Sequence, residues 1–278
     1  MNKLNKAIYL ICFSLILTDS VQALELCGEM AQGELIQGQS EKIEQAYYNN
    51  SELSIADDGS FLFAFSRNEE PSQALQITTE KNNTLSYPLA VAPTQWDIQK
   101  INGVSPRKVE PTELDYRKIH KEQDDLKQAL SYNIKTPYWK TGFIMPVKGR
   151  TSGNFGGQRI MNGKAKSPHS GMDIAAAEGS PVYAASDGVV TLSDGEYFYT
   201  GNMVVIAHGQ NLSTIYAHLK SATVKKGDKV KQGDIIGHVG KTGRATGPHL
   251  HWGASVNGVR FQPLSLLKIG DKNLCKNL

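Results

Sequence analysis

Two short arrangements of histidine and aspartate could bind a metal ion. In the first, His169 is followed four residues later by Asp173, and in the second, His249 and His251 flank a single residue. Residues two apart on a strand face the same side of a sheet, so the second pair should point into one space. On a straight strand His169 and Asp173 would lie about 13 Å apart, and Gly171 would allow the chain to bend between them.

These side chains suit a catalytic zinc site. Imidazole and carboxylate groups bind zinc, and three protein ligands with an open fourth position are typical of a catalytic rather than a structural site. Zinc lowers the pKa of a bound water toward about 7, which makes a nucleophile available at neutral pH. Two histidines and one aspartate would leave the site positively charged, which favours hydroxide and a polarised carbonyl. The spacing alone leaves open which of His249 and His251 binds the metal.

Six segments between residues 142 and 267 carry a family resemblance. They are FGGQR (155–159), HSGMDIAA (169–176), PVYAASDGVV (181–190), YAHL (216–219), KVKQGDIIGHVG (229–240) and TGRATGPHLHWG (242–253). Their sequences and their order resemble the lysostaphin and LytM-type zinc endopeptidases of peptidase family M23. The resemblance implies a peptidase that hydrolyses peptide bonds in bacterial peptidoglycan.

The resemblance also assigns roles to the histidines and the aspartate. It implies that His169, Asp173 and His251 hold one zinc ion per chain. His218 and His249 would form the catalytic pair, which helps to deprotonate the attacking water and to stabilise the tetrahedral oxyanion. The remaining histidines are expected to be solvated or structural; they are His120, His208 and His238.

Two departures from the family pattern concern the substrate groove. HLHWG replaces the aromatic and acidic ending that often follows the second histidine of the HxH motif. We therefore expect Trp252 and Gly253 to change the floor of the groove rather than the zinc chemistry. The loop of residues 194–202 carries additional aromatic side chains, which bear on substrate contacts. Further candidate groove residues are Asn154, Arg159 and Tyr199.

The first part of the mature chain, residues 24–110, is predicted to form a small antiparallel β domain. The segment SFLFAFS (60–66) alternates along its length and follows a turn signal at residues 57–59. Two further strand-like segments are ALQITTE (74–80) and LSYPLAVA (85–92), which are separated by an Asn-Asn turn.

A helical linker is predicted over residues 111–136. Thr112 can cap the start of a helix that runs to about residue 131. Its apolar stripe is thin, so the helix should pack lightly. It is either a solvated linker or a lever that places the first domain over the second. The first domain could accordingly position substrate or cover the groove.

The last part of the chain, residues 137–270, is predicted to be an antiparallel β domain with long glycine-rich loops. Strand-like segments cover residues 203–209, 213–219 and 234–240, and each ends at or near a glycine. The fold class is therefore mainly β, with a small β domain, a connecting helix and a C-terminal LytM-like peptidase domain.

The N-terminus has the features of a secretory signal. Lys3 and Lys6 precede an apolar run at residues 7–17, and small residues precede a predicted cleavage point after residue 23. No later segment is apolar enough to cross a bilayer. Removal of residues 1–23 would leave two cysteines, Cys27 and Cys275, which could form a disulfide in an oxidising compartment.

The formal net charge of +3 favours neither nucleic acid nor an anionic membrane as a partner. We expect an exported, periplasmic zinc metalloendopeptidase whose partners are the peptide stems of peptidoglycan. A second hypothesis is a LytM-like, non-catalytic activator of cell-wall amidases, although such domains typically lack zinc ligands. A third is a secreted endopeptidase directed at competitors or at glycine-rich proteins.

Overall fold

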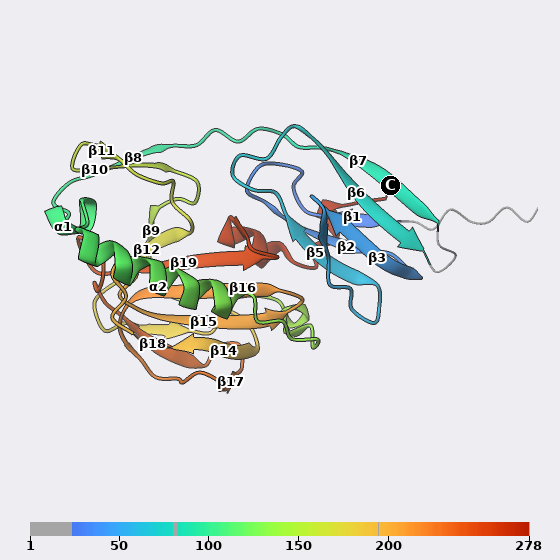
Figure 1. Ribbon diagram of the computed structural model, residues 1–278. Helices are drawn as coiled ribbons and strands as arrows, with labels where there is room; N and C mark the ends of the chain where they lie inside the picture. Colours follow the sequence, from blue (N-terminus) through green and yellow to red (C-terminus); the bar gives the residue numbers. More distant parts are fainter. Residues whose placement is uncertain (1–23, 80–82, 194, 278) are drawn as a thin grey trace, which may run out of the picture.

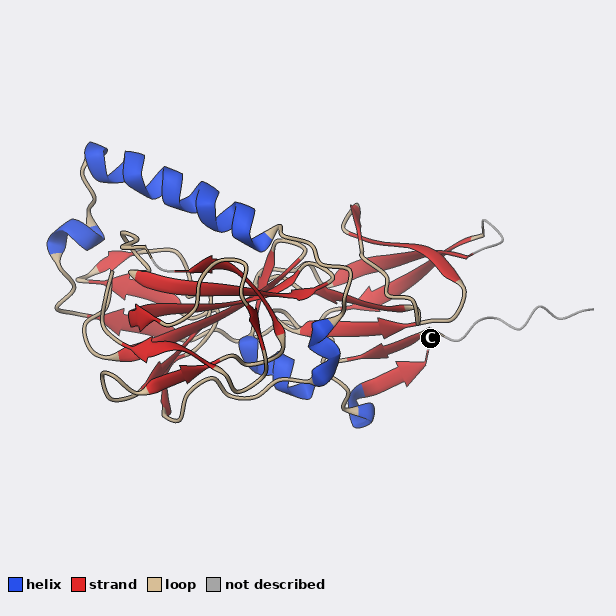
Figure 2. Cartoon of the chain, turned by 90° about the horizontal axis from the view of Figure 1, so that it is seen from below, coloured by secondary structure: helices blue, strands red, loops and turns tan. Residues whose placement is uncertain are grey.

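A computed structural model describes residues 24–79, 83–193 and 195–277. The predicted signal segment, residues 1–23, lies outside the described residues. Strands dominate the structure, which confirms the prediction of a mainly β fold (Figures 1 and 2). In the described part of the chain, no helix combines the length and the apolar character needed to span a membrane.

The N-terminal half builds two four-stranded antiparallel sheets. The first has the order β21 (Cys275–Asn277), β1 (Glu25–Cys27), β2 (Leu35–Gln39), β5 (Ser60–Ala64). The second has the order β4 (Ser51–Glu52), β3 (Ile43–Tyr48), β6 (Ser72–Thr79), β7 (Thr84–Ala90). Their apolar side chains form one buried cluster with the aromatic side chains of β5 at its centre.

Strand β5 belongs to two hydrophobic cores at once. Phe61 and Phe63 pack in the N-terminal cluster, whereas Leu62 and Ala64 pack in the large cluster of the C-terminal half. Every residue of the strand is buried, because alternate side chains point to opposite faces and both faces are covered. The strand predicted at 60–66 is therefore present, and it joins the two halves through shared packing.

The end of the chain returns to the N-terminal sheet. Strand β21 pairs with β1 and places Cys275 directly opposite Cys27, and the two form the predicted disulfide. The crosslink joins residues 248 positions apart in sequence. It therefore ties both ends of the described chain to the same sheet edge.

Two helices connect the halves, α1 (Pro106–Val109) and α2 (Glu113–Leu130). The predicted cap is present, since the Thr112 side chain accepts a hydrogen bond from the Asp115 backbone and Asp115 bonds back to Thr112. Helix α2 lies along one face of the C-terminal sheet (Figure 1), where Leu126 and Ala129 pack against Met203. The helix is thus anchored on the sheet and is not a free linker.

The C-terminal half is built on a ten-stranded sheet. Its main path is β17 (Lys229–Val230), β14 (Gly188–Ser193), β15 (Asn202–Gly209), β16 (Leu212–Ala222), β19 (His249–Val256), β12 (Met172–Ala175), β9 (Arg150–Gly153). Three strands lie off this path: β13 (Pro181–Tyr183), β18 (Ile235–Val239) and β20 (Val259–Phe261). The 3-10 helices are η1 (Tyr138–Thr141), η2 (Pro263–Lys268) and η3 (Lys272–Leu274).

A small third sheet links the connecting segment to the C-terminal half. Its order is β11 (Lys164–Ala165), β10 (Gln158–Met161), β8 (Ile98–Ile101), and β8 runs parallel to β10. Strand β8 lies within the predicted first domain but pairs with a strand of the predicted peptidase domain. The domain boundaries given above stay a prediction.

Trp252 does not form the floor of a groove, and that expectation was wrong. Its side chain is fully buried in the C-terminal core beside Leu250 and Ile174. On β19 the side chains alternate, so Trp252 points away from the face that carries His251.

We predict that Leu62→Ala destabilises the C-terminal half. Truncating a buried leucine costs roughly 2–5 kcal/mol, and the cavity would open in the core that contains Trp139 and Trp252. Urea unfolding followed by tryptophan fluorescence should show a lower midpoint. Leu85→Ala is the matched control, because Leu85 is exposed on β7. An unchanged midpoint for Leu62→Ala would mean that the halves do not share a core.

Candidate metal and catalytic site

Three predicted ligands converge on one point. His169 Nε2 lies 2.9 Å from His251 Nδ1 and 3.0 Å from Asp173 Oδ1, and the Asp173 oxygen lies 2.9 Å from His251 Nδ1. All three residues are buried. Ligands placed tetrahedrally at 2.0–2.1 Å from zinc are separated by roughly 3.3 Å, so this triangle fits one face of such a site with little movement. The two nitrogens and one oxygen suit zinc.

The register of two strands brings these ligands together. Strands β12 and β19 are antiparallel, with Asp173 opposite His251 and Ala175 opposite His249. His169 reaches the same place because the chain bends at residues 170–171 just before β12. A Cβ on Gly171 would lie 2.8 Å from His251 Nε2 and 2.5 Å from the Trp252 carbonyl oxygen. Glycine is therefore needed here because two backbones approach closely.

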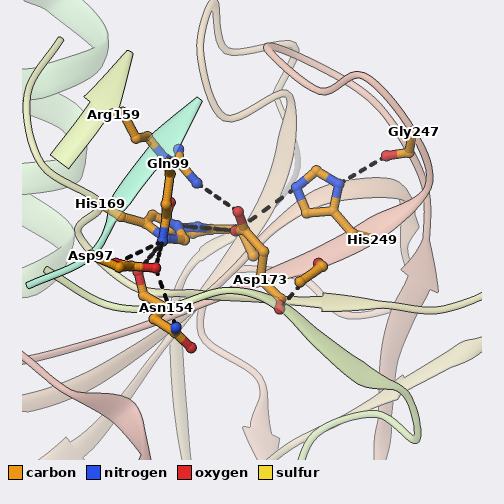
Figure 3. Close-up of polar contacts among 10 residues, drawn as sticks. Asp97, Gln99, Asn154, Arg159, His169, Asp173, Gly247 and His249 are labelled. Carbon is orange, nitrogen blue, oxygen red and sulfur yellow. Dashed lines mark hydrogen bonds and ion pairs between the residues drawn. The ribbon is translucent and has the colours of Figure 1, made fainter. Parts of the chain in front are cut away.

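Outer contacts orient the ligands (Figure 3). His169 Nδ1 donates to the Asn154 carbonyl oxygen at 2.9 Å, which leaves its Nε2 lone pair directed at the cluster. The same carbonyl oxygen accepts a hydrogen bond at 3.0 Å from the side-chain amide of Gln99, a residue of β8. Arg159 Nη2 lies 2.5 Å from the second carboxylate oxygen of Asp173, so one oxygen of Asp173 faces the cluster and the other faces Arg159.

The predicted catalytic pair stands beside the ligands. The rings of His218 and His249 have centroids 4.7 Å apart, and the His218 ring lies 5.9 Å from that of His251. His218 Nδ1 donates to the Thr242 carbonyl and His249 Nδ1 donates to the Gly247 carbonyl, each at 2.8 Å. In both rings, Nε2 is therefore the atom left to accept a proton. His249 Nε2 lies 3.8 Å from the ligand oxygen of Asp173.

The backbone at His218 is strained. Its φ is 61°, a conformation that few non-glycine residues adopt and that is concentrated at functional sites. His218 lies in β16, and its backbone amide donates a hydrogen bond to the Thr200 carbonyl at 2.8 Å, which anchors the backbone in this conformation. The conformation holds the imidazole beside His249.

Burial favours the neutral form of three imidazoles, those of His169, His218 and His251. It lowers the pKa of His218 to about 3 and that of His251 to about 4, and it also lowers the pKa of His169. Burial alone would raise the pKa of Asp173, but the adjacent imidazoles of His169 and His251 hold it well below its ordinary value. At neutral pH the cluster therefore offers neutral nitrogens and a carboxylate, which are the protonation states that bind metal.

A cavity of about 550 Å³ opens on the site. His218 and His251 line it from the sheet, and helix α2 supplies another wall that includes Tyr116 and the exposed His120. Of the candidate groove residues, Arg159 and Tyr199 line the cavity, whereas Asn154 acts through its carbonyl on His169.

Two other places carry no part of this site. A larger cavity of about 860 Å³, lined by residues 52–58 and 133–137 among others, contains none of the predicted site residues. A second group of side chains that could bind a metal consists of Glu25, Cys27 and Cys275. Both of its sulfurs form the disulfide, so neither is a free thiolate ligand.

Of the remaining histidines, His120 lines the cavity from α2, whereas His208 and His238 are not among the residues that line it. His208 is fully buried and bonds to the Asp187 carbonyl and to Thr214, so it is structural. His238 is partly buried beside Ser221.

Sequence reasoning missed the groups that orient the site. Gln99 lies far from the motifs in sequence, and no pattern marked it. The carbonyls of Asn154, Thr242 and Gly247 leave no signal, because every residue has a carbonyl. Arg244, which lines the cavity, stands inside the quoted motif TGRATGPHLHWG but received no role.

Comparisons with known proteins agree on one family. Residues 167–263 match the model of peptidase family M23. The peptidoglycan DD-endopeptidase ShyA of Vibrio cholerae is 45% identical over 122 residues, which are 44% of this chain and 27% of ShyA. The DD-carboxypeptidase/endopeptidase Mpg of Neisseria meningitidis is 46% identical over 98 residues, which are 35% of this chain and 22% of Mpg. The match spans about a quarter of the length of these relatives.

A solved structure resembles nearly the whole chain. It is a protein of Pseudomonas aeruginosa assigned to peptidase M23, with a TM-score of 0.68 and 25% identity. The likeness covers 86% of this chain and 95% of that one, so it includes parts of both the N-terminal and the C-terminal halves.

We predict that one equivalent of added Zn²⁺ binds the purified chain and that His251→Ala weakens this binding by more than about 100-fold. Loss of an outer-shell partner alone costs 10- to 100-fold, and a direct ligand should cost at least as much. Competition with a chromophoric chelator measures the affinity. His238→Ala is the control and should bind as the wild type does. Wild-type affinity in His251→Ala would contradict the ligand assignment.

Proposed function

Since the chain carries a peptidase family M23 domain, we propose that it is a zinc-dependent endopeptidase that hydrolyses peptide cross-links of bacterial peptidoglycan. The observation that best supports this function is the convergence of His169, Asp173 and His251 beside the catalytic pair His218 and His249. The names of two relatives, the peptidoglycan DD-endopeptidase ShyA and the DD-carboxypeptidase/endopeptidase Mpg, support a peptidoglycan substrate. Export to the periplasm is the location that fits this substrate.

His169, Asp173 and His251 would hold the zinc ion. When bound, zinc supplies Lewis acidity and lowers the pKa of water at the site. The chain's own groups do the rest. The Nε2 atoms of His218 and His249 can accept a proton from the attacking water and pass it to the leaving amine. Once protonated, either ring can donate a hydrogen bond to the oxyanion that develops on the scissile carbonyl.

The alternative is a non-catalytic activator of cell-wall amidases. Such a role does not need a complete metal site. Retention of all three ligands and of both catalytic histidines supports the enzyme over the activator.

We also propose that residues 24–110 and 111–136 position substrate and are not a cover that swings away. Three contacts support this role: the shared strand β5, the pairing of β8 with β10, and the disulfide between Cys27 and Cys275. Displacing the N-terminal half would break the C-terminal core. The wall that α2 gives to the cavity would then be a fixed part of the substrate site.

Digestion of purified peptidoglycan tests the proposed function. The zinc-loaded chain should release uncross-linked peptides, which mass spectrometry identifies. His169→Ala should release none, because a metal ligand is lost. His218→Ala should bind zinc but turn over 10²- to 10⁴-fold more slowly, the usual loss for a general acid–base group.

His238→Ala serves as the control and should match the wild type. Stoichiometric zinc with no released peptide from the wild type would overturn the enzyme proposal and favour the activator.

A further inference from the structure

Arg244 is held in the wall of the active-site cavity. Its guanidinium carbon lies 4.2 Å from the centroid of the Tyr199 ring, and its backbone amide donates to the Tyr199 carbonyl at 2.8 Å. The neighbouring Gly243, at φ 73°, lets the two loops meet backbone to backbone, since a Cβ there would lie 2.4 Å from the Gly201 nitrogen. The side chain is half-buried, and its position is set by these contacts.

The guanidinium of Arg244 has no acid partner across residues 24–79, 83–193 and 195–277. No carboxylate of those residues lies within 4.0 Å of it, and its side-chain nitrogens donate to no acceptor among them. Arg159, in the same cavity, is instead paired with Asp173 (Figure 3). A guanidinium stacked on an aromatic ring keeps its in-plane N–H donors free, and these match both oxygens of a carboxylate.

The cavity offers Arg244 little competition from its own acids. Among the described residues that line the cavity, Glu122 carries the one carboxylate. This carboxylate already accepts a hydrogen bond from the Phe198 backbone amide at 2.7 Å and lies 3.6 Å from the Lys118 ammonium. Two further cations line the cavity, Lys166 and the Asp173-paired Arg159. The cavity wall is therefore positively charged and suits an anionic group on the substrate.

We propose that Arg244 binds a carboxylate carried by the leaving-group side of the scissile peptide bond. The inference rests on the proposed function. In that reaction water oxygen adds to the scissile carbonyl carbon, the carbon–nitrogen bond breaks, and the nitrogen takes a proton, giving a carboxylate and an amine. His218 can hold that proton, and its ring is fixed by the Thr242 carbonyl, two residues from Arg244. His218 and Arg244 both line the cavity, so an amine that takes its proton from His218 leaves within the cavity that Arg244 lines.

This geometry defines a substrate class. A suitable leaving amine has a carboxylate on the adjacent carbon. Peptides that end in a free amino acid have this arrangement, and so do cross-links made through a diamino acid whose acylated amine lies beside a carboxylate. Cross-links through glycine bridges or lysine side chains lack it. Arg244 would therefore favour the first two classes, and one site would serve both carboxypeptidase and endopeptidase cleavage.

The test uses two peptides that differ at one group. Both are an acylated D-Ala-D-Ala, one with a free C-terminal carboxylate and the other with a carboxamide. The zinc-loaded wild type should show a kcat/KM for the carboxylate peptide roughly 10- to 100-fold above that for the carboxamide, the range expected for charge-assisted hydrogen bonds. Arg244→Gln should bring this ratio to about 1. Arg244→Lys keeps the positive charge but loses the paired N–H donors of the guanidinium, so it should give an intermediate ratio.

The ratio is insensitive to partial misfolding, because both peptides meet the same enzyme sample. Lys241→Gln, an exposed lysine of the same loop, is the control and should keep the wild-type ratio. Cleavage of neither peptide by a wild type that releases peptides from purified peptidoglycan would leave the proposed function and overturn this subsite. Equal cleavage of both by the wild type would leave a peptidase and overturn the subsite. An unchanged ratio in Arg244→Gln would also overturn it and direct attention to Lys166.

Discussion

The antiparallel pairing of β12 with β19 is the constraint on which the site depends. It sets Asp173 opposite His251, while β16 on the other side of β19 sets Ala217 opposite His251 and so brings His218 alongside. A one-residue slip of β19 would turn its histidines into the core and Trp252 toward the cavity, because side chains alternate along a strand. The apolar core that buries Trp252 and Leu250 therefore also fixes the register of the metal ligands.

The N-terminal half is joined to this arrangement by packing as well as by chain connectivity. Alternate side chains of β5 enter two cores, and β8 carries Gln99 to the carbonyl that orients His169. Segments far from the peptidase motifs thus take part in the outer shell of the metal site. The N-terminal half thus supplies no ligand but contributes an outer-shell contact, and shared packing and strand pairing join it to the C-terminal half.

The sequence was sufficient to predict the convergence of ligands but not what orients them. HxH on a strand and the bend at Gly171 follow from backbone geometry, and both are present in the structure. Alternation along β19 also places Trp252 in the core, on the face opposite His249 and His251, which is why it does not form a groove floor. The carbonyls that fix His169, His218 and His249 depend on tertiary contacts that no local pattern encodes.

X-ray absorption at the zinc edge of the metal-loaded chain tests the central claim most directly. The arrangement of His169, Asp173 and His251 predicts a first shell of nitrogen and oxygen only, at about 2.0–2.1 Å, with two imidazoles and an open position taken by solvent. A first shell that lacks imidazole nitrogen, or one that contains sulfur at about 2.3 Å, would contradict the account.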